Sequence, residues 1–217
     1  WLFKTIYFSL HLRVSFRRMR ANMKIDWLTR LDQEYDRAWK RVHHLIILPM
    51  AYESYEIVRE SFTALAASHY PKERLLVVLA REARIPESEL IAQKIAQEFS
   101  GSFSYLSVTA HPEGLIGEIP GKGSNEAWAA EETKRTVIDP VGIPYEDILV
   151  SVFDADTQIG PEYFGVLTYA FLKAPAPLRS SYQPIPLFVN NIFQAPALAR
   201  VIAFASSFWH MIQQARP

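Results

Sequence analysis

The sequence contains no cysteine, no excess of either charge and no long uninterrupted apolar run. Without cysteine, disulfide scaffolds, cysteine-ligated zinc, iron–sulfur clusters and thiol catalysis are excluded. The 23 basic and 23 acidic residues balance, which argues against a globally basic nucleic-acid-binding protein, so we expect no nucleic-acid partner. With 217 residues, 49% of them hydrophobic, the chain is expected to fold as one domain or as one domain with an appendage.

Residues 1–41 differ in character from the rest of the chain. The first 16 are strongly apolar but contain Lys4, His11 and Arg13, and a basic cluster follows at residues 17–24. Apolar side chains recur at helical spacing, at Phe3, Ile6, Tyr7, Leu10 and Val14. No run reaches the roughly 18–20 apolar residues that span a bilayer. The pattern predicts amphipathic, juxtamembrane helices at a membrane surface, with the basic residues on the cytoplasmic side. The alternative is a helix that packs against protein.

From residue 42 onward, short apolar runs alternate with segments of helical spacing. The predicted strands are residues 45–48, 75–79, 102–108 and 148–153. The predicted helices are residues 53–68, 86–99, 124–136, 161–173 and 197–214. This alternation favours an α/β domain over residues 42–217, with a mostly parallel central sheet flanked by helices. Because the sequence begins at Trp1 and stops at Pro217 directly after an apolar helical pattern, we expect it to be a fragment of a longer protein.

Acidic residues follow the predicted strands, at the edge of a parallel sheet where ligands bind. The sharpest case is Asp154-Ala155-Asp156, directly after the fourth strand. In an extended chain the two aspartates point to the same side, and such close carboxylates repel each other unless a cation lies beside them. Mg²⁺ or Mn²⁺ would suit these oxygens and complete its shell with phosphate oxygens and water. The alternative is an ordinary acidic turn that starts the next helix.

The segment Gly121-Lys122-Gly123 matches a phosphate-binding loop only in part. A Walker-type loop needs four residues between its glycine and Gly-Lys-Ser/Thr, but Gly117 is one residue too close and Gly123 occupies the hydroxyl position. What remains is a flexible backbone, a cation and a helix start, which favour an anion. The alternative is a loop that simply needs glycine. The chain has no Gly-x-Ser-x-Gly and no His-Glu-x-x-His motif, so serine hydrolases and zinc proteases lack support.

An ordered series of segments resembles one protein family. The segments are residues 44–53, 68–71, 76–79, 121–125 and 150–157. Together they resemble family 2 glycosyltransferases, inverting enzymes of the GT-A fold that use nucleotide-sugar donors, and the membrane-associated, cellulose-synthase-like branch is the nearest. The resemblance covers about residues 43–195. It implies a hexosyltransferase-like, metal-dependent enzyme that moves a sugar from a nucleotide-diphosphate donor to a glycan or lipid-linked acceptor.

The resemblance implies a role for each matching residue of the donor site. Pro49 and Glu53 correspond to positions that hold the base and the ribose, and Glu82 to a second acidic contact with the nucleotide. Lys122 stands where a lysine approaches the diphosphate. The family's usual Asp-Asp or Asp-x-Ser after the second strand is replaced by Ala-Arg-Glu at residues 80–82.

The same resemblance implies a metal site and an acceptor side. Asp154 and Asp156 correspond to the Asp-x-Asp pair that holds Mg²⁺ or Mn²⁺ and the donor diphosphate, and Gln183 lies in the region that lines the acceptor. The family's later Glu-Asp pair, which supplies the base, and its Gln-x-x-Arg-Trp segment do not occur before Pro217. The catalytic base is therefore unknown and is expected beyond Pro217.

Two other kinds of function remain open from the sequence. A non-catalytic module that binds a nucleotide sugar or a carbohydrate would keep the same fold and lack the base. A metal-dependent nucleotidylyltransferase or pyrophosphatase would also use paired acids with a diphosphate. The glycosyltransferase hypothesis additionally predicts association with a membrane and a catalytic domain in the cytoplasm.

Overall fold

The larger unit of the structure is an α/β domain. A computed structural model describes residues 1–189, 192–193 and 195–214. Contacts group the chain into two units, Trp27–Leu178, which holds the sheet, and Trp1–Asp26 with Arg179–Pro217. The expected division of the chain at residues 41 and 42 stays a prediction.

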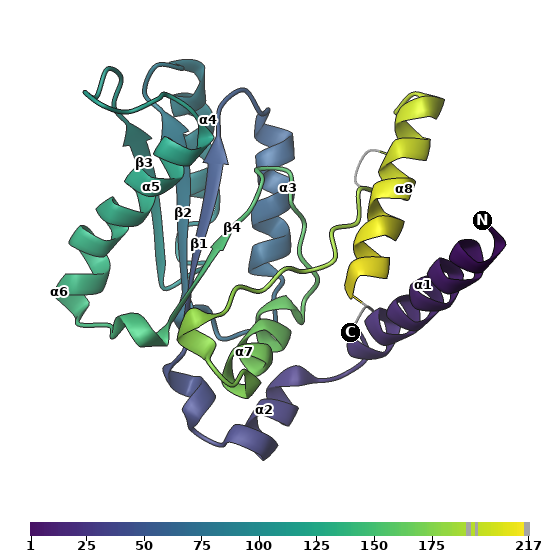
Figure 1. The fold of residues 1–217 in the computed structure, drawn as a ribbon. Helices are drawn as coiled ribbons and strands as arrows, with labels where there is room; N and C mark the ends of the chain where they lie inside the picture. Colours follow the sequence, from purple (N-terminus) through teal and green to yellow (C-terminus); the bar gives the residue numbers. More distant parts are fainter. Residues whose placement is uncertain (190–191, 194, 215–217) are drawn as a thin grey trace. The chain divides into compact units, whose positions relative to one another are not determined.

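Four parallel strands form the central sheet of the larger unit (Figure 1). They are β1 (His43–Met50), β2 (Leu75–Glu82), β3 (Tyr105–His111) and β4 (Ile148–Val152). Their order is β3-β2-β1-β4, so β1 and β2 are central, and all three pairings are parallel. Residues of β1 and β2 are buried almost throughout, which explains their near-continuous apolar runs. The α/β class and the parallel sheet are thereby confirmed.

Two strands differ from their predicted ranges for physical reasons. β1 continues through Pro49 instead of stopping there. Its pairing with β4 ends at Ile47, so the missing N–H of Pro49 leaves no gap in that ladder. β3 begins at Tyr105, three residues later than predicted, because Ser102 still belongs to the turn after the preceding helix, where its N–H donates to Phe99 O at 3.0 Å.

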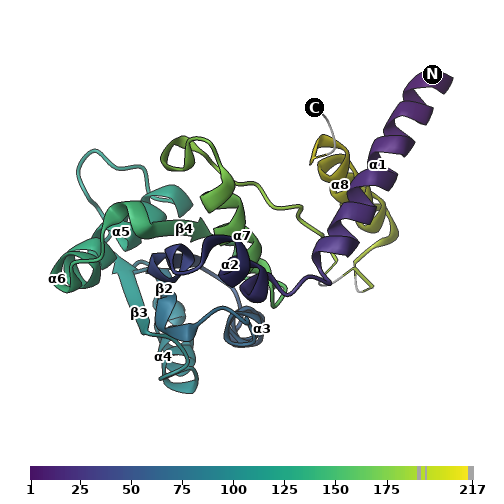
Figure 2. The same ribbon diagram turned by 90° about the horizontal axis from the view of Figure 1, so that it is seen from below.

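Helices cover both faces of the sheet. The helices of this unit are α2 (Trp27–Tyr35), α3 (Tyr55–Ala66), α4 (Glu87–Glu98), α5 (Lys122–Thr133), α6 (Asp139–Val141) and α7 (Tyr163–Lys173). A π-helix (Lys134–Ile138) joins α5 to α6, and 3₁₀ turns lie at Ala38–Arg41, Lys72–Arg74, Tyr145–Asp147 and Pro177–Arg179. Figure 2 shows α3 and α4 on one side of the sheet and α5 and α6 on the other.

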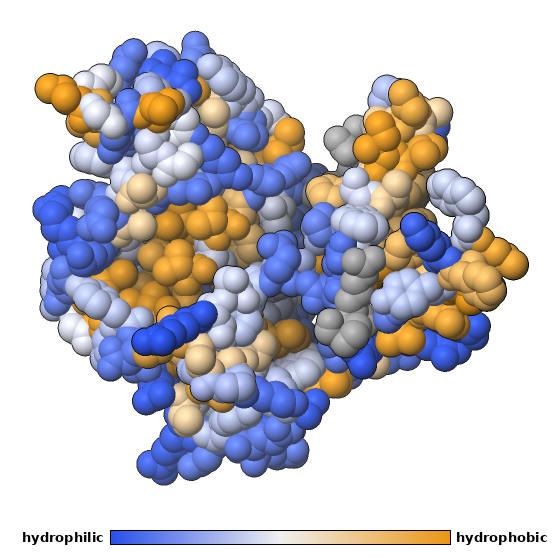
Figure 3. Space-filling view, in the orientation of Figure 1, coloured by the Kyte–Doolittle hydropathy of each residue, from blue (hydrophilic) through white to orange (hydrophobic). Residues whose placement is uncertain are grey.

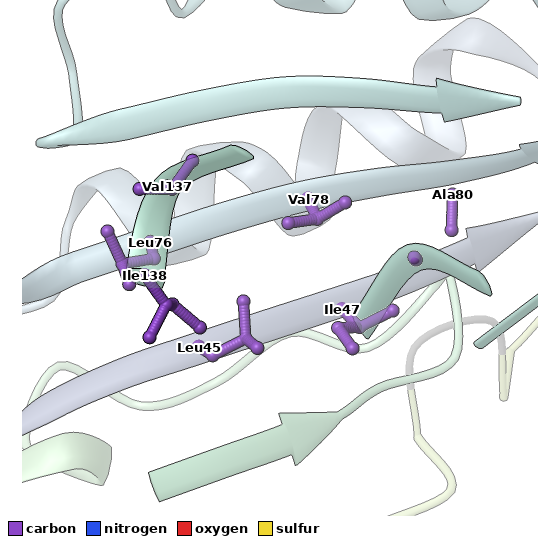
Figure 4. Close-up of a cluster of buried hydrophobic side chains, with 8 residues drawn as sticks. Leu45, Ile47, Leu76, Val78, Ala80, Val137 and Ile138 are labelled. Carbon is purple, nitrogen blue, oxygen red and sulfur yellow. The ribbon is translucent and has the colours of Figure 1, made fainter. Parts of the chain in front are cut away.

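Alternate residues of the central strands form separate core layers on the two faces. One layer is a cluster under α5 and the π-helix, and it includes Leu45, Ile47, Leu76, Val78, Ala80, Ala129, Val137 and Ile138 (Figure 4). The intervening β1 residues Ile46 and Leu48 are fully buried on the opposite face, as is Phe62 of α3. The two layers fix the register of the sheet and with it the positions of the strand ends.

One face of α2 and of the turn after it packs into the core, whereas most of their other residues are exposed. Trp27 and Trp39 are buried, although residues 26–41 have the charged character of an exposed segment. The ring centroids of Trp27 and Tyr169 on α7 lie 5.0 Å apart. A β-carbon on Gly165 of α7 would lie only 2.8 Å from Trp27 Cβ, so the close contact of the two helices depends on this glycine.

The start of α5 lies two residues before its predicted position at Ser124. The Oγ of Ser124 accepts a hydrogen bond from Gly121 N–H at 3.1 Å and donates to Gly121 O at 2.8 Å. The first of these bonds satisfies the Gly121 N–H, which has no partner within the helix, and Gly121 O also accepts the helical bond from Asn125 N–H at 3.1 Å. Lys122 is therefore the first residue of the helix.

The smaller unit contains two helices that pack against each other, α1 (Leu2–Asn22) and α8 (Ala197–Gln214). The rings of Phe8 and Trp209 lie 6.3 Å apart. Both helices expose apolar side chains, which colour their surface orange in Figure 3. Residues 180–189 form neither helix nor strand. Within the described ranges, no helix is both long and apolar enough to cross a membrane.

Candidate functional site

The loops at the carboxyl edge of the sheet bring several charged residues together. Because all strands are parallel, β1, β2 and β4 end at the same edge. The loop after β1 carries Glu53, the segment after β4 carries Asp154 and Asp156, and α5 begins with Lys122. Pro49 lies one step earlier, paired with Ala80 inside the sheet. This edge is where open α/β sheets bind ligands.

The segment after β4 leaves the sheet in a turn that exposes both aspartates, with Thr157 N–H donating to Asp154 O at 2.9 Å. The N–H of Phe153 donates to Ile47 O at 3.0 Å and continues the ladder beyond the strand. Phe153 and Ala155 are buried, whereas Asp154 and Asp156 are exposed. The buried side is fixed by a hydrogen bond of 2.7 Å from a serine of α3 to the carbonyl of Ala155. Burial alternates from Phe153 to Asp156, but residues 154–157 form a turn, so the extended geometry expected for the two aspartates is not what the structure shows.

Lys122 forms an ion pair with Asp154. The Nζ of Lys122 also lies 3.8 Å from Glu126 Oε1. The hydrogen bond to Asp154 raises the pKa of Lys122 above its ordinary value against the opposing effect of burial, and the charges of Asp154, Glu126 and Glu53 raise it further. The lysine therefore remains a cation at neutral pH and lies within the electrostatic reach of carboxylates from three different segments.

A hollow of about 380 Å³ lies between the loop after β1 and the start of α4. Its walls include Tyr52, Glu53, Ile85, Glu87 and Ile91. Tyr52 is 81% exposed, so one aromatic ring is available to a ligand at this place. The Glu53 carboxylate is oriented by the N–H of Ala51, which donates to its Oε2 at 2.6 Å. Its walls mix apolar side chains with carboxylates.

Glu82 lies at the end of β2, and its side chain is only 5% exposed. Its Oε2 lies 3.4 Å from His111 Nδ1 and 3.5 Å from Arg84 Nε. Glu82 is not among the residues that line the hollow. The structure thus places this predicted nucleotide contact against a buried histidine of the neighbouring strand.

Gln183 belongs to the smaller unit. Its carbonyl accepts a hydrogen bond of 2.8 Å from Gln214 Nε2 of α8. Its side-chain amide donates to Pro184 O at 3.4 Å. The structure shows these local contacts, and the expected place of Gln183 on the acceptor side stays a prediction.

Sequence reasoning missed Asn125 as a residue that shapes this edge. Asn125 is 1% exposed, and its Nδ2 donates to Ala80 O at 2.8 Å, which fastens the first turn of α5 to β2. Its Oδ1 has no hydrogen-bond partner within the described part of the chain. The signal that could have found it is its spacing of four from the buried Ala129, which places a polar side chain on the buried face of a helix.

The two exposed aspartates have the donor chemistry that a hard divalent cation prefers. Among the residues that the structure describes, no group of three or more His, Asp and Glu side chains lies together as a metal site. Asp154 and Asp156 could supply two carboxylates to an ion that takes its other ligands from phosphate oxygens and water. The residues present therefore fit such an ion when it arrives with a diphosphate.

Comparison of the chain with protein-family models finds no matching model, and comparison with curated proteins finds no matching protein. The class of the fold follows from the parallel sheet and its flanking helices. A functional assignment has to rest on the chemistry of the residues at the sheet edge, because fold alone does not define function.

Proposed function

We propose that this chain is the nucleotide-sugar-binding domain, of GT-A type, of an inverting and metal-dependent glycosyltransferase. The observation that carries the proposal is the meeting of Lys122 with Asp154, beside Asp156, at the carboxyl edge of a parallel sheet. A cation, two exposed carboxylates and a helix N-terminus at one place suit a diphosphate bound with a divalent ion. The ordered motifs of the sequence support the same assignment.

Each residue at the edge has a proposed part in holding the donor. Asp154 and Asp156 hold Mg²⁺ or Mn²⁺, and Lys122 pairs with diphosphate oxygens, aided by the dipole of α5. The ion, when bound, neutralises negative charge on the leaving diphosphate. In the structure Lys122 offsets the charge of Asp154, so donor binding exchanges one partner of the lysine for another.

The nucleoside is proposed to occupy the hollow beside β1. Tyr52 offers an exposed ring on which a base can stack, and Glu53 offers a carboxylate that can accept hydrogen bonds from ribose hydroxyls. Pro49 shapes the end of β1 next to this loop. Glu82 keeps its proposed place on the nucleotide side, with its carboxylate held against His111. The proposal assigns no catalytic base among the 217 residues.

The proposed acceptor is a glycan or a lipid-linked sugar, with Gln183 on the acceptor side and a membrane surface close by. Residues 1–25 contain six Lys and Arg residues and no Asp or Glu, the six being Lys4, Arg13, Arg17, Arg18, Arg20 and Lys24. The exposed apolar residues of α1 gather in its N-terminal half, with Leu2 69% and Phe3 87% exposed. Such separation of apolar and basic residues suits a helix that inserts one end among lipids and places its cations at anionic headgroups. Because basic residues favour the cytoplasmic side of a membrane, this orientation of α1 would place the catalytic domain in the cytoplasm.

Two other functions fit part of the same site. A non-catalytic binding module would use the same hollow and the same acids without a base. A nucleotidylyltransferase or pyrophosphatase would also bind a metal and a diphosphate there. The products distinguish the three functions. Sugar transfer releases a nucleoside diphosphate, nucleotidyl transfer exchanges pyrophosphate, and a binding module releases neither.

Calorimetry tests the proposal on the protein as it stands. The purified protein is titrated with UDP, GDP and inorganic pyrophosphate, each with and without Mn²⁺. We expect one nucleoside diphosphate to bind only in the presence of the ion and more tightly than pyrophosphate, since the hollow adds contacts to the nucleoside. Equal binding with and without Mn²⁺, or no binding of either nucleotide, would contradict the proposed site.

A further inference from the structure

The hollow beside β1 is rich in side chains that accept hydrogen bonds. The polar side chains of its walls are those of Tyr52, Glu53, Glu87 and Ser88, and of the described residues that line it none is Lys, Arg or His. The Ser88 hydroxyl donates to Ile85 O at 2.6 Å, within its own turn. Because a carboxylate accepts hydrogen bonds and donates none, a ligand that suits these walls has to bring N–H or O–H donors of its own.

Glu87, the first residue of α4, brings an unoccupied carboxylate to these walls. The residue is exposed, and within the described part of the chain its carboxylate takes part in no hydrogen bond or ion pair. Glu89, two positions further on, differs because its Oε2 lies 3.3 Å from Arg81 Nη2. Glu53 differs too, since its Oε2 already accepts a backbone hydrogen bond of 2.6 Å. Glu87 is therefore the acid of the hollow with both oxygens available to a ligand.

The common nucleotide bases differ in what they offer to a carboxylate. On its Watson–Crick edge guanine has two adjacent donors, N1–H and the 2-amino group, which match the two oxygens of one carboxylate. Uracil has a single N–H between two carbonyl oxygens, and a carboxylate repels those oxygens. Adenine and cytosine place the lone pair of a ring nitrogen beside their amino group, so only one carboxylate oxygen finds a donor. Guanine is thus the base that a free carboxylate favours.

We propose that Glu87 selects guanine, so that the donor of this domain is a GDP-sugar. The inference rests on the proposed function, which places the nucleoside in this hollow with its base on Tyr52 and its ribose at Glu53. The Glu87 carboxylate then accepts both N1–H and the 2-amino group, and the charge on the acceptor strengthens these bonds. Glu87 has no part in holding the ion or the diphosphate, so the choice of base is tested separately from the metal site.

Calorimetry with a series of nucleotides tests this selection in the whole protein. GDP, inosine diphosphate (IDP), UDP and ADP are each titrated in the presence of Mn²⁺. We expect GDP to bind at least about tenfold more tightly than UDP or ADP, which is the effect of a hydrogen bond to a charged group. IDP differs from GDP only by the missing 2-amino group, and for the same reason it should bind about tenfold more weakly than GDP. Equal binding of IDP and GDP would overturn the proposal.

The variant Glu87→Gln should change the preferred base. A glutamine amide offers one oxygen acceptor and one NH₂ donor. This pair matches the N1–H and the 2-carbonyl oxygen of xanthine, whereas in guanine the NH₂ donor would face the 2-amino group. We therefore expect the ratio of GDP affinity to xanthosine diphosphate affinity to fall by at least about tenfold in Glu87→Gln. The same ratio in Glu87→Gln and the wild-type protein would overturn the proposal.

The matched control is Glu89→Gln, which changes another exposed acid of α4 that lies outside the walls of the hollow. It should keep the wild-type ratio, and an equal fall in both variants would refute the part of Glu87. A thermal melt of each variant verifies that the fold is intact. If no nucleoside diphosphate binds, the proposed function fails and the selection fails with it. If UDP or ADP binds with Mn²⁺ at least as tightly as GDP, the proposed function stands and the selection of guanine is refuted.

Discussion

Lys122, the first residue of α5, forms an ion pair with Asp154, the second residue after β4, across 32 positions of the sequence. The pair joins a helix N-terminus, which attracts anions, to an acid of the type that binds divalent ions. Both side chains are more than half exposed. Exposed ion pairs contribute little to stability, so we expect the loss of either charge to leave the fold intact.

The first prediction concerns Lys122 itself. Lys122→Met should lower the affinity for a nucleoside diphosphate with Mn²⁺ by at least about tenfold, because a charge-assisted contact to phosphate is lost. The melting temperature should change little, since the ion pair is exposed. Lys134→Met is the control. Lys134, the first residue of the π-helix, also pairs with a glutamate, whose Oε2 lies 3.7 Å from the lysine Nζ. Equal effects of the two substitutions on affinity would contradict the role of Lys122.

The second prediction concerns Asp156. The test uses a protein that also includes the catalytic base. There, Asp156→Ala should reduce metal-dependent sugar transfer on the order of 10²–10³-fold. This is the usual effect of removing one group that stabilises charge in a transition state. The fold should be intact by circular dichroism, since Asp156 is exposed. Glu146→Ala removes another exposed carboxylate and should leave transfer unchanged. Undiminished transfer by Asp156→Ala defeats the metal assignment.

The third prediction concerns His44 on β1. Burial lowers the pKa of His44 to about 3, with a smaller effect from His43, and its Nε2 lies 2.9 Å from Thr168 Oγ1. Between that value and the unfolded pKa of about 6.5, the unfolded chain binds the proton and the folded protein does not, so stability falls as the pH falls. At about pH 5 the expected loss is about 2 kcal/mol relative to pH 8.

Urea denaturation at several pH values measures this loss. His44→Gln removes the titrating group, so its free energy of unfolding should depend less on pH in the acid range than that of the wild-type protein. His210→Gln, which changes a histidine of the smaller unit, should keep the wild-type slope. Parallel slopes for His44→Gln and the wild-type protein would show that His44 is not buried in its neutral form.

The fourth prediction compares two glycines in helices. Gly165→Ala should destabilise the protein by about 1–3 kcal/mol despite the better helix propensity of alanine, because the new β-carbon would meet Trp27 Cβ at 2.8 Å. Gly123→Ala has nothing within 4 Å of the new β-carbon and should stabilise by up to about 1 kcal/mol. Thermal or urea unfolding measures both, and equal signs for the two changes would contradict the packing of α2 on α7.

The fifth prediction concerns the basic end of α1. Replacing Arg13, Arg17 and Arg20 with glutamine should weaken binding to vesicles that contain anionic phospholipid on the order of 100-fold, since each surface cation contributes about 1 kcal/mol. A triple replacement of Lys40, Lys94 and Lys134 in the larger unit is the control and should have little effect. Flotation with vesicles of neutral and anionic composition measures the binding. Equal binding to both compositions would refute an electrostatic contribution.

The central strands were predictable because burial on both faces leaves a run of apolar residues in the sequence. β3 was predicted less well, because its residues are mostly half-buried and its apolar run is interrupted. The start of α5 was missed because Gly121 and Gly123 have low helix propensity. The bond from Asn125 N–H to Gly121 O and the contact of Ser124 with Gly121 show that the helix begins at Lys122.

The acids at the strand end were found from sequence because they directly follow an apolar run, although they lie in a turn and not in the extended chain that was expected. The ion pair of Lys122 with Asp154 could not be foreseen, since it depends on how α5 lies across the sheet. The contact of His111 with Glu82 depends on the register of β2 and β3, which places these two residues opposite each other. Register is set by packing over whole strands, and a single sequence does not show it.

The most direct test of the central claim is where Mn²⁺ binds. A paramagnetic ion broadens the NMR signals of nearby amides, so a spectrum recorded with Mn²⁺ and a nucleoside diphosphate locates the ion in the protein. We predict broadening at residues 154–157, at Lys122 and at Glu53, and its disappearance in Asp154→Asn. Broadening centred on Glu82 and His111, or broadening at residues 154–157 that survives in Asp154→Asn, would contradict the account.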